Sequence, residues 1–344
     1  MKRFLLIISI LAVSSCLNRG AQYVQIQGFA QGGKYTVKIN MKGVGIPAET
    51  VRDSIDALLT TIDTTLSGYN RNSLLSRFNA GEKIPATPMF LDMYSKSYAL
   101  WERSGGALDF AAGPLYDAWG FGFKTNEFPK DEHVAEILQN CGMGRLPSAL
   151  TQEDGFVNPA LAGFPKLNFN AIAQGYSCDV IASYLYSIGV KDMLVDIGEI
   201  WCDGVNPAGK PWSVGVDRPV DRPTDGSEGA DAGLDGVWSS EGKPAGIVTS
   251  GNYRKYYIRD GRKYAHIINP ITGYPVQHNL LSATVVSKNS AAESDAVATW
   301  CMVIGLEEAR SLILGDPSLE GYLIYAAQDG EMKEWASPGF TLKD

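Results

Sequence analysis

Histidine and cysteine are scarce in this sequence of 344 residues, which contains 3 histidines and 5 cysteines. No two of His133, His266 and His278 have the spacing of paired zinc ligands on a helix, so a His-rich zinc or iron site is excluded. The cysteines share no C-x-x-C spacing, which excludes a zinc ribbon and a thioredoxin-type site. If the protein uses a metal, we therefore expect a hard cation held by oxygen ligands.

Positive charge is also in short supply. Lys and Arg total 30 against 38 Asp and Glu, which gives a formal net charge of -8. Proteins that bind nucleic acids hold the phosphate backbone with dense Lys and Arg surfaces, so we expect no nucleic-acid partner. Hydrophobic residues make up 45% of the chain and charged residues 20%. This is a globular composition, long enough for one large domain or two small ones.

Long apolar runs are absent, and the short one over residues 4–13 belongs to an export signal. It follows Lys2 and Arg3, precedes small residues, and is too short to span a bilayer comfortably. Val-Ser-Ser-Cys at 13–16 resembles a bacterial lipoprotein cleavage site, in which Cys16 becomes the lipidated first residue. We expect a signal peptide over residues 1–15, a lipidated tether over 16–25 and one domain over 26–344. Such a chain would be anchored by lipid to a membrane of the bacterial cell envelope.

The cysteines other than Cys16 would then lie in an oxidising compartment. One or two disulfides are compatible with the sequence. Buried free thiols are equally compatible, because two of these cysteines fall inside apolar helical patterns. The pairing stays open for Cys141, Cys178, Cys202 and Cys301.

Helices and strands are mixed without a regular β-α-β order, which favours an α+β fold over a doubly wound parallel sheet. Helical spacing of apolar residues predicts helices over 48–66, 87–103, 173–188 and 290–304. Residues 217–245 are rich in acids, glycine and proline, and predict a flexible loop between two strands. The expected strands are 193–197, 212–216, 247–250, 264–268, 281–287 and 322–327.

The sequence lacks the familiar nucleotide-binding motifs. Residues 204–211 nearly spell a phosphate-binding loop, but Pro211 stands where a hydroxyl should bind magnesium, and Pro207 lacks an amide N–H. We interpret the segment as a turn between strands. No G-x-G-x-x-G follows a strand, and no G-x-S-x-G elbow occurs.

Two segments carry side chains suited to chemistry. Asp295 and Thr299 are four residues apart on a predicted helix, so their oxygens share one face and suit Mg²⁺. On its own this pair is more typical of Asp295 favouring the helix dipole and Thr299 bonding back to its helix. His266 alternates with apolar residues on a predicted strand that ends in a Pro-Gly turn, where it can face a cleft and accept a hydroxyl proton near neutral pH.

Taken in order, several segments resemble the ApbE family, periplasmic lipoproteins that act as FAD:protein FMN transferases. Each segment is weak alone, but together they follow the family order over nearly the whole mature chain. The resemblance implies a single catalytic domain with mixed, mainly antiparallel sheets flanked by helices. The matching segments are 30–35, 66–70, 76–79, 109, 114–122, 168–175 with Tyr176 and Asp179, 194–198, 249–254, 266–273 and 295–299.

The resemblance implies a Mg²⁺-dependent reaction that cleaves FAD, releases AMP and attaches FMN through a phosphoester to a Thr or Ser. The acceptor would be a flavoprotein subunit of a respiratory or electron-transfer complex. A cation neutralises charge on the pyrophosphate and fixes in-line geometry. By resemblance, His266 deprotonates the acceptor hydroxyl. The implied metal ligands are the Asp295 carboxylate, the Thr299 hydroxyl and the carbonyl of Ala171, with help from the backbone at Ala298.

The same resemblance implies a set of FAD contacts, among which Tyr69 suits stacking on an aromatic ring. The chain departs from the family where Gln31 and Gly33 replace Met and Thr, and where Asn269 replaces Asp. Asn168 and Gln174 stand where Asp and a charged residue are common. These changes mostly preserve shape and remove negative charge, so they bear on polar contacts to FAD rather than on the activity. The implied FAD contacts are Gln31, Tyr69, Ala107, Leu108, Asp109, Asn168 and Gln174, with Ile268 or Asn269 near the phosphates.

Two other functions stay open at this point. A Mg²⁺-dependent FAD pyrophosphatase would release FMN and AMP by using water in place of the acceptor hydroxyl. A flavin-binding lipoprotein would hold FAD without reaction. The intact set of Asp295, Thr299 and His266 favours the transferase.

Overall fold

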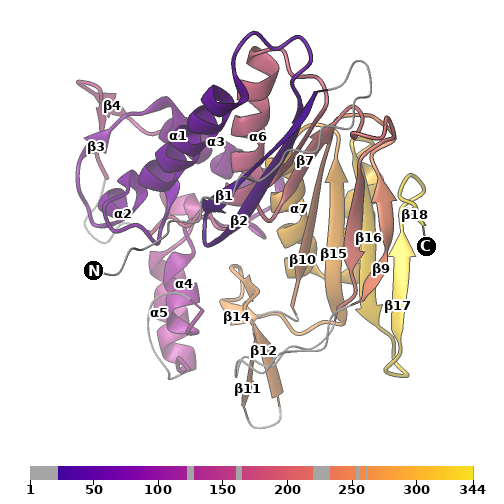
Figure 1. Ribbon diagram of the computed structural model, residues 1–344. Coiled ribbons are helices and arrows are strands. Elements are labelled where there is room, and N and C mark those ends of the chain that lie inside the picture. Colours follow the sequence, from indigo (N-terminus) through magenta and orange to yellow (C-terminus); the bar gives the residue numbers. More distant parts are fainter. Residues whose placement is uncertain are drawn as a thin grey trace, which may run out of the picture.

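The computed structural model describes residues 22–121, 128–159, 165–219, 233–252, 256–259 and 262–343. Its centre is an eight-stranded sheet in the order β1-β2-β6-β7-β10-β15-β16-β17, in which every neighbouring pair is antiparallel (Figure 1). The expected α+β class with mainly antiparallel sheets is confirmed. The strands are β1 (Tyr23–Ala30), β2 (Gly33–Asn40), β6 (Met193–Asp196), β7 (Ile200–Asp203), β10 (Ala245–Gly251), β15 (Leu280–Ser287), β16 (Leu319–Ala326) and β17 (Met332–Ala336).

Helices cover one face of this sheet. In α1, Val51, Ile55 and Leu59 are spaced at helical intervals and are buried against β1 and β2. In contrast, α7 is buried nearly all round, because it lies between β10 and β15 on one side and outer helices on the other. The helices are α1 (Ala48–Leu66), α2 (Leu74–Asn79), α3 (Pro88–Arg103), α4 (Gly113–Ala118), α5 (Asp131–Asn140), α6 (Ala173–Ser187), α7 (Ala291–Ile304) and α8 (Leu306–Gly315), with a 3₁₀ turn at Met143–Arg145.

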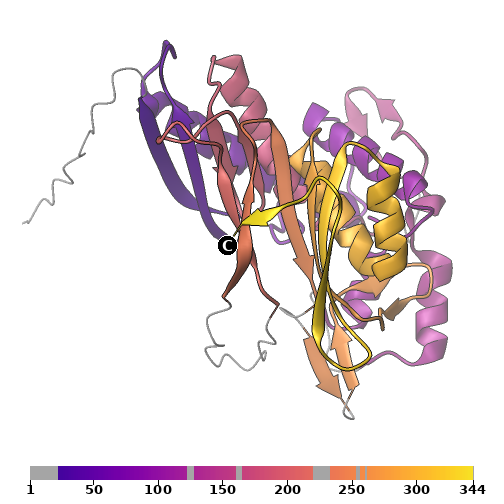
Figure 2. The same ribbon diagram turned by 90° about the vertical axis from the view of Figure 1, so that its right-hand side faces the viewer.

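A small sheet packs on the opposite face. It has the order β18-β9-β8 and buries Trp212, Trp238 and Phe340 against the large sheet. Figure 2 shows the C-terminus on this side and the gold helices on the other. Its strands are β8 (Ser213–Asp217), β9 (Leu234–Ser239) and β18 (Leu342–Lys343).

Shorter strand pairs lie outside these layers. The hairpin of β11 and β12 extends beyond the end of the large sheet (Figure 1), and β13 with β14 follows it along the chain. The remaining small sheet has the order β3-β5-β4. These strands are β3 (Ile84–Pro85), β4 (Gln152–Glu153), β5 (Phe156–Val157), β11 (Tyr256–Arg259), β12 (Arg262–Ala265), β13 (Ile268–Asn269) and β14 (Tyr274–Pro275).

All four predicted helices are present, and two of them begin at side-chain caps. The Thr87 hydroxyl accepts a hydrogen bond from the N–H of Phe90, and Pro88 occupies the first helical position. The Ser290 hydroxyl accepts from the N–H of Glu293 at 3.0 Å, the first half of a capping box. The turn over 204–211 also forms, between β7 and β8.

The structure differs from the sequence prediction at several places. The strand expected over 264–268 is interrupted, because β12 pairs with β11 whereas β13 pairs with β14. The loop expected over 217–245 contains β9, because Trp238 of this strand is buried between the small sheet and the large sheet; residues 220–232 lie outside the described residues. The paired strand β1 begins at Tyr23, within the expected tether, because Tyr23 is already paired with Asn40.

The hairpin of β1 and β2 was not predicted from the sequence. Its two turn residues, Gln31 and Gly32, have φ angles of 51° and 81°, which is typical of a tight hairpin turn. The inward alternation of Tyr35, Val37 and Ile39 was the available signal.

Cys141, Cys178, Cys202 and Cys301 are free and buried, so the structure contains no disulfide among them. Cys16 and the expected signal peptide lie outside the described residues. Within the described part of the chain, none of the helices has the length and apolar character needed to cross a membrane.

Candidate active site

The first turns of α6 and α7 meet at the candidate site. A Cβ atom on Gly175 would lie 2.3 Å from the carbonyl oxygen of Ala291, so the absence of a side chain permits this approach. A Cβ atom on Gly246 of β10 would lie 2.5 Å from the Cα of the same alanine. Two glycines therefore allow α6, α7 and β10 to converge on Ala291.

The carboxylate of Asp295 lies at this junction and is only 5% exposed. Its Oδ2 accepts a hydrogen bond from the backbone N–H of Gly175 at 3.0 Å, and the N–H of Gln174 also donates to the carboxylate. Both N–H groups belong to the first turn of α6, where helical amides have no partner within their own helix. Asp295 therefore caps the neighbouring helix and interacts with the dipole of α6.

This cap leaves the carbonyl oxygen of Ala171 available. At an ordinary helix start, the N–H of Gly175 would donate to that carbonyl, four residues earlier. The next amide follows the rule, since Tyr176 donates to Ile172 at 2.9 Å. The N–H of Gly175 instead donates to Asp295. Among the described residues, no hydrogen-bond donor contacts the Ala171 carbonyl, so this part of the chain leaves both of its lone pairs available.

The burial of Asp295 calls for a positive partner. Its pKa is raised to about 7, chiefly by burial and also by the nearby Asp179, while the backbone amides of α6 partly offset this rise. No cation of the described residues offsets this charge. A buried carboxylate without a cation is costly, so the site fits a bound metal ion.

The oxygen donors at the site fit a hard cation. Among the described residues there is no group of three or more His, Cys, Asp and Glu that could hold a metal. One carboxylate, one hydroxyl and one free carbonyl instead suit Mg²⁺, which keeps several waters or substrate phosphates.

Thr299 supplies the hydroxyl. It lies one turn after Asp295, and its Oγ1 is 3.4 Å from the Oγ of Ser250 at the end of β10. The hydroxyl therefore faces the sheet and is not bonded back to its own helix. Ala298 is a different case, because it is fully buried in mid-helix and its carbonyl belongs to the helical hydrogen-bond ladder. The contribution of the Ala298 backbone to a metal site therefore stays a prediction.

Two expected FAD contacts lie beside the start of α6. The side-chain amide of Gln31 donates to the hydroxyl of Ser177 on α6. The hydroxyl of Tyr69 accepts from the side chain of Asn170 at 3.3 Å, and Tyr69 is 68% exposed. Its ring is therefore accessible for stacking.

Gln174 connects α6 to the large sheet. Its side-chain amide donates to the carbonyl of Ile197 at 3.0 Å, in the turn between β6 and β7. Gly198 accommodates this contact, since a Cβ atom there would lie 2.8 Å from the Gln174 amide nitrogen. The side chain of Gln174, an expected FAD contact, therefore holds the β6–β7 turn in this structure.

Residues 107–109 offer a ligand their backbone atoms more than their side chains. Ala107 and Leu108 are buried in the core, so a ligand would meet their backbone atoms. Asp109 accepts hydrogen bonds from the N–H groups of Ala111 and Met143, and burial raises the pKa of its carboxyl. The N–H of Asn168 donates to the carbonyl of Phe110, the residue after Asp109, at 2.7 Å.

His266 lies between β12 and β13 and is partly buried. Its ring is 6.4 Å from that of Phe121, in an edge-to-face arrangement. Farther along, the side-chain oxygen of Asn269 accepts from the N–H groups of Ile271 and Thr272 and so shapes the following turn.

This turn lies near residues 106–108. A Cβ atom on Gly106 would be 3.9 Å from the side chain of Ile271. Ile268 is fully buried, so only its backbone could approach phosphates. The contacts thus connect the 269–273 turn with Gly106, and connect α6 with Asp295 and, through Ser177, with Gln31. Thr299 is connected to the end of β10 through Ser250.

One cavity lies away from the candidate site. It has a volume of about 480 Å³ and contains none of the expected site residues. A smaller cavity of about 120 Å³ is bordered by Gly198 and Thr249, next to residues that contact Gln174 and Thr299. Sequence reasoning assigned no role to Ser250, Ser177 or Asp179, whose partners are far away along the chain.

The fold and site define an α+β protein in which a buried carboxylate of α7 caps α6, with a histidine on the connection between β12 and β13. Residues 32–323 match the model of the ApbE family. The chain therefore belongs to the ApbE family, whose curated relatives are transferases.

Relatives resemble the chain along most of its length. A Vibrio cholerae protein named FAD:protein FMN transferase is 32% identical, with 96% of each chain covered. The Escherichia coli protein of the same name is 30% identical and covers 84% of this chain and 80% of its own. Among solved structures, the flavin transferase ApbE from Vibrio cholerae has a TM-score of 0.75 at 30% identity, covering 92% of this chain and 98% of its own. The apo flavinyl transferase ApbE of Pseudomonas stutzeri has a TM-score of 0.78 at 28% identity, covering 93% and 96%.

The raised pKa of Asp295 predicts a pH-dependent stability. Its pKa of about 7 in the folded chain lies above the ordinary 3.8. The folded chain therefore holds a proton that the unfolded chain releases at lower pH. The stability linked to this proton is fully present below the unfolded pKa and is lost as pH rises through the folded pKa. In EDTA, we expect the parent to lose more unfolding free energy than Asp295→Asn between about pH 5 and about pH 9. The difference should be about 1 kcal/mol or more, since one pKa unit corresponds to about 1.4 kcal/mol. Urea unfolding at both pH values measures this difference. An equal change of unfolding free energy with pH in the parent and in Asp295→Asn would contradict the assignment.

Proposed function

We propose that the chain is a Mg²⁺-dependent FAD:protein FMN transferase. It would cleave the FAD pyrophosphate and attach FMN by a phosphoester bond to a Thr or Ser of a target flavoprotein, with release of AMP. The observation that carries this proposal is the buried Asp295 carboxylate, beside a helix start whose Ala171 carbonyl accepts no hydrogen bond from the described residues. The names of relatives at 30–32% identity support the substrate and the reaction.

Three groups would hold the magnesium ion: the Asp295 carboxylate, the Thr299 hydroxyl and the Ala171 carbonyl. When bound, the ion would neutralise charge on the pyrophosphate and leave positions for phosphate oxygens. The chain itself would fix the donor groups before substrate arrives, because α6 and α7 are joined through Asp295.

Residues around the start of α6 would position FAD. Tyr69 offers an exposed ring for stacking, and its hydroxyl is already oriented by Asn170. Gln31 lies at the tip of the β1–β2 hairpin and reaches α6 through Ser177. Binding at these points would hold the pyrophosphate in place for attack, which is the main contribution of such enzymes to phosphoryl transfer.

His266 would act as the general base. The acceptor hydroxyl oxygen forms a bond to the FMN phosphorus, and the bond from that phosphorus to the bridging oxygen breaks. The electron pair leaves with AMP, and the hydroxyl proton goes to the imidazole. The acceptor would be a subunit of a respiratory or electron-transfer complex.

The transferase is tested with the purified chain, FAD, Mg²⁺ and an acceptor domain that carries a Thr or Ser. Mass spectrometry should find an acceptor heavier by one FMN. In His266→Ala the rate of transfer should fall about 100-fold or more, because general bases contribute that much. The control is His133→Ala, which alters an exposed histidine on α5.

Each outcome separates the candidate functions. Release of AMP without any modified acceptor would contradict the transferase and favour a pyrophosphatase. FAD binding without AMP would favour a flavin-binding protein. Hydrolysis that survives in His266→Ala while transfer is lost would show that this histidine serves the acceptor.

We also propose that the chain is a lipoprotein anchored through Cys16, with its domain in the periplasm. The support is the sequence at residues 1–16: two cations, a short apolar run and a cysteine after small residues. In cells, Cys16→Ser should abolish incorporation of labelled palmitate and move the protein from the membrane fraction to the supernatant. Labelling that persists in this variant would contradict the anchor.

A further inference from the structure

A second carboxylate links α6 and α7 in the reverse direction. Asp179 of α6 accepts hydrogen bonds from the N–H groups of Ala291 and Ala292 at 2.8 and 3.0 Å. These N–H groups belong to the first turn of α7 and have no partner within that helix. Each helix thus supplies the carboxylate that caps the other, since Asp295 of α7 binds the first turn of α6.

This exchange fixes the two helices relative to each other at two points. Each oxygen of Asp179 binds a different amide, so the contact restrains the direction of α7 as well as its distance. Asp295 and Thr299 lie one and two turns beyond these amides on the same helix. The free carbonyl of Ala171 lies just before α6, the helix that carries Asp179. A shift of α7 against α6 would therefore move two proposed ligands away from the third.

We propose that Asp179 is a positioning residue for the metal site: it sets α7 so that Asp295 and Thr299 meet the Ala171 carbonyl. The inference rests on the proposed function, because it needs a metal at these oxygens. Asp179 itself is bonded to backbone amides and is not a ligand. Groups that orient ligands without touching the metal typically change its affinity by 10–100-fold when removed.

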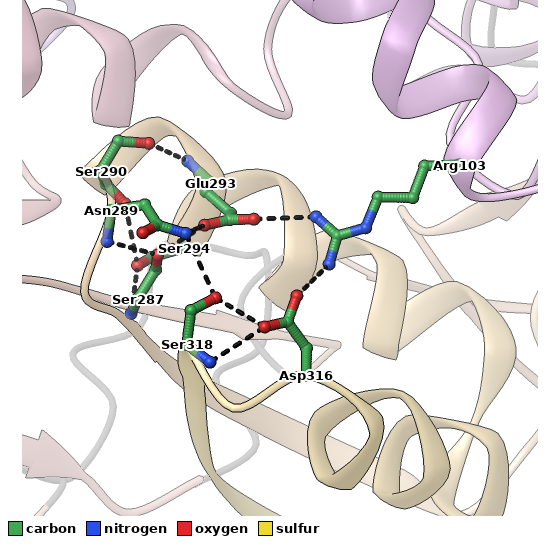
Figure 3. Close-up of polar contacts among 8 residues, drawn as sticks. All are labelled: Arg103, Ser287, Asn289, Ser290, Glu293, Ser294, Asp316 and Ser318. Atoms are coloured by element: carbon green, nitrogen blue, oxygen red, sulfur yellow. Dashed lines mark hydrogen bonds and ion pairs between the residues drawn. The ribbon is translucent and has the colours of Figure 1, made fainter.

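A second anchor of α7 provides a matched control. Arg103 of α3 forms ion pairs of 2.8 Å with Glu293 of α7 and with Asp316 after α8 (Figure 3). Glu293 also accepts hydrogen bonds from Ser287 and Asn289. The side chains of Arg103 and Glu293 hold the same turn of α7 but reach it from α3 and from the end of β15, and neither of them bonds to α6. Removing Arg103 should therefore loosen α7 without breaking the two reciprocal helix caps formed by Asp179 and Asp295.

The test measures Mn²⁺ binding to the full chain after removal of metal with EDTA, with free Mn²⁺ followed by EPR. Relative to the parent, we expect Kd to rise about 10-fold or more in Asp179→Ala. Asp179→Asn should give an intermediate value, because its amide oxygen can still accept one of the two hydrogen bonds. In Arg103→Met, Kd should stay within about two-fold of the parent. Thermal unfolding of every variant reports the loss of stability separately.

The outcomes distinguish positioning from a purely structural role. Parent-like Mn²⁺ affinity in a folded Asp179 variant would overturn the inference, and so would an equal loss in Arg103→Met. If Asp179→Ala does not fold, Asp179→Asn decides between the same outcomes. A parent chain that binds no Mn²⁺ would instead overturn the proposed metal site, and the inference with it.

Discussion

The hydrogen bonds from the first turn of α6 to the Asp295 carboxylate are the interaction on which the site depends. They bring together residues 120 positions apart. They also satisfy amides that have no partner in their own helix, and divert the N–H of Gly175 from the Ala171 carbonyl. This contact thus places the Asp295 carboxylate in a buried position and leaves the Ala171 carbonyl without the amide of Gly175. A single cation could bind both oxygens.

The surrounding structure makes this contact feasible. Gly175 and Gly246 remove the side chains that would separate α6, α7 and β10. Burial raises the pKa of Asp179 to about 6, as it raises that of Asp295, so two acids share one poorly solvated junction. A metal-free junction of this kind is less stable at high pH, and a bound cation would offset that cost.

The sequence predicted much of the fold and the pair of residues on α7, but not their environment. Helical spacing placed Asp295 and Thr299 on one face, and Ser290 marked the helix start, because these signals are local. The sequence could not show that Asp295 caps α6 or that Thr299 meets Ser250, since both contacts depend on tertiary packing. The family resemblance implied Ala171 as a ligand. The reason its carbonyl is free emerges only from the hydrogen bonds of α6.

The central claim is that Asp295, Thr299 and the Ala171 carbonyl form one metal site. Crystals soaked in MnCl₂ test it most directly, through the anomalous difference map. The account predicts a peak bonded to all three oxygens at about 2.0–2.3 Å, close to the distances of Mg²⁺ sites. A map with no peak at the junction of α6 and α7, or with a peak that leaves the Ala171 carbonyl unbound, would contradict it.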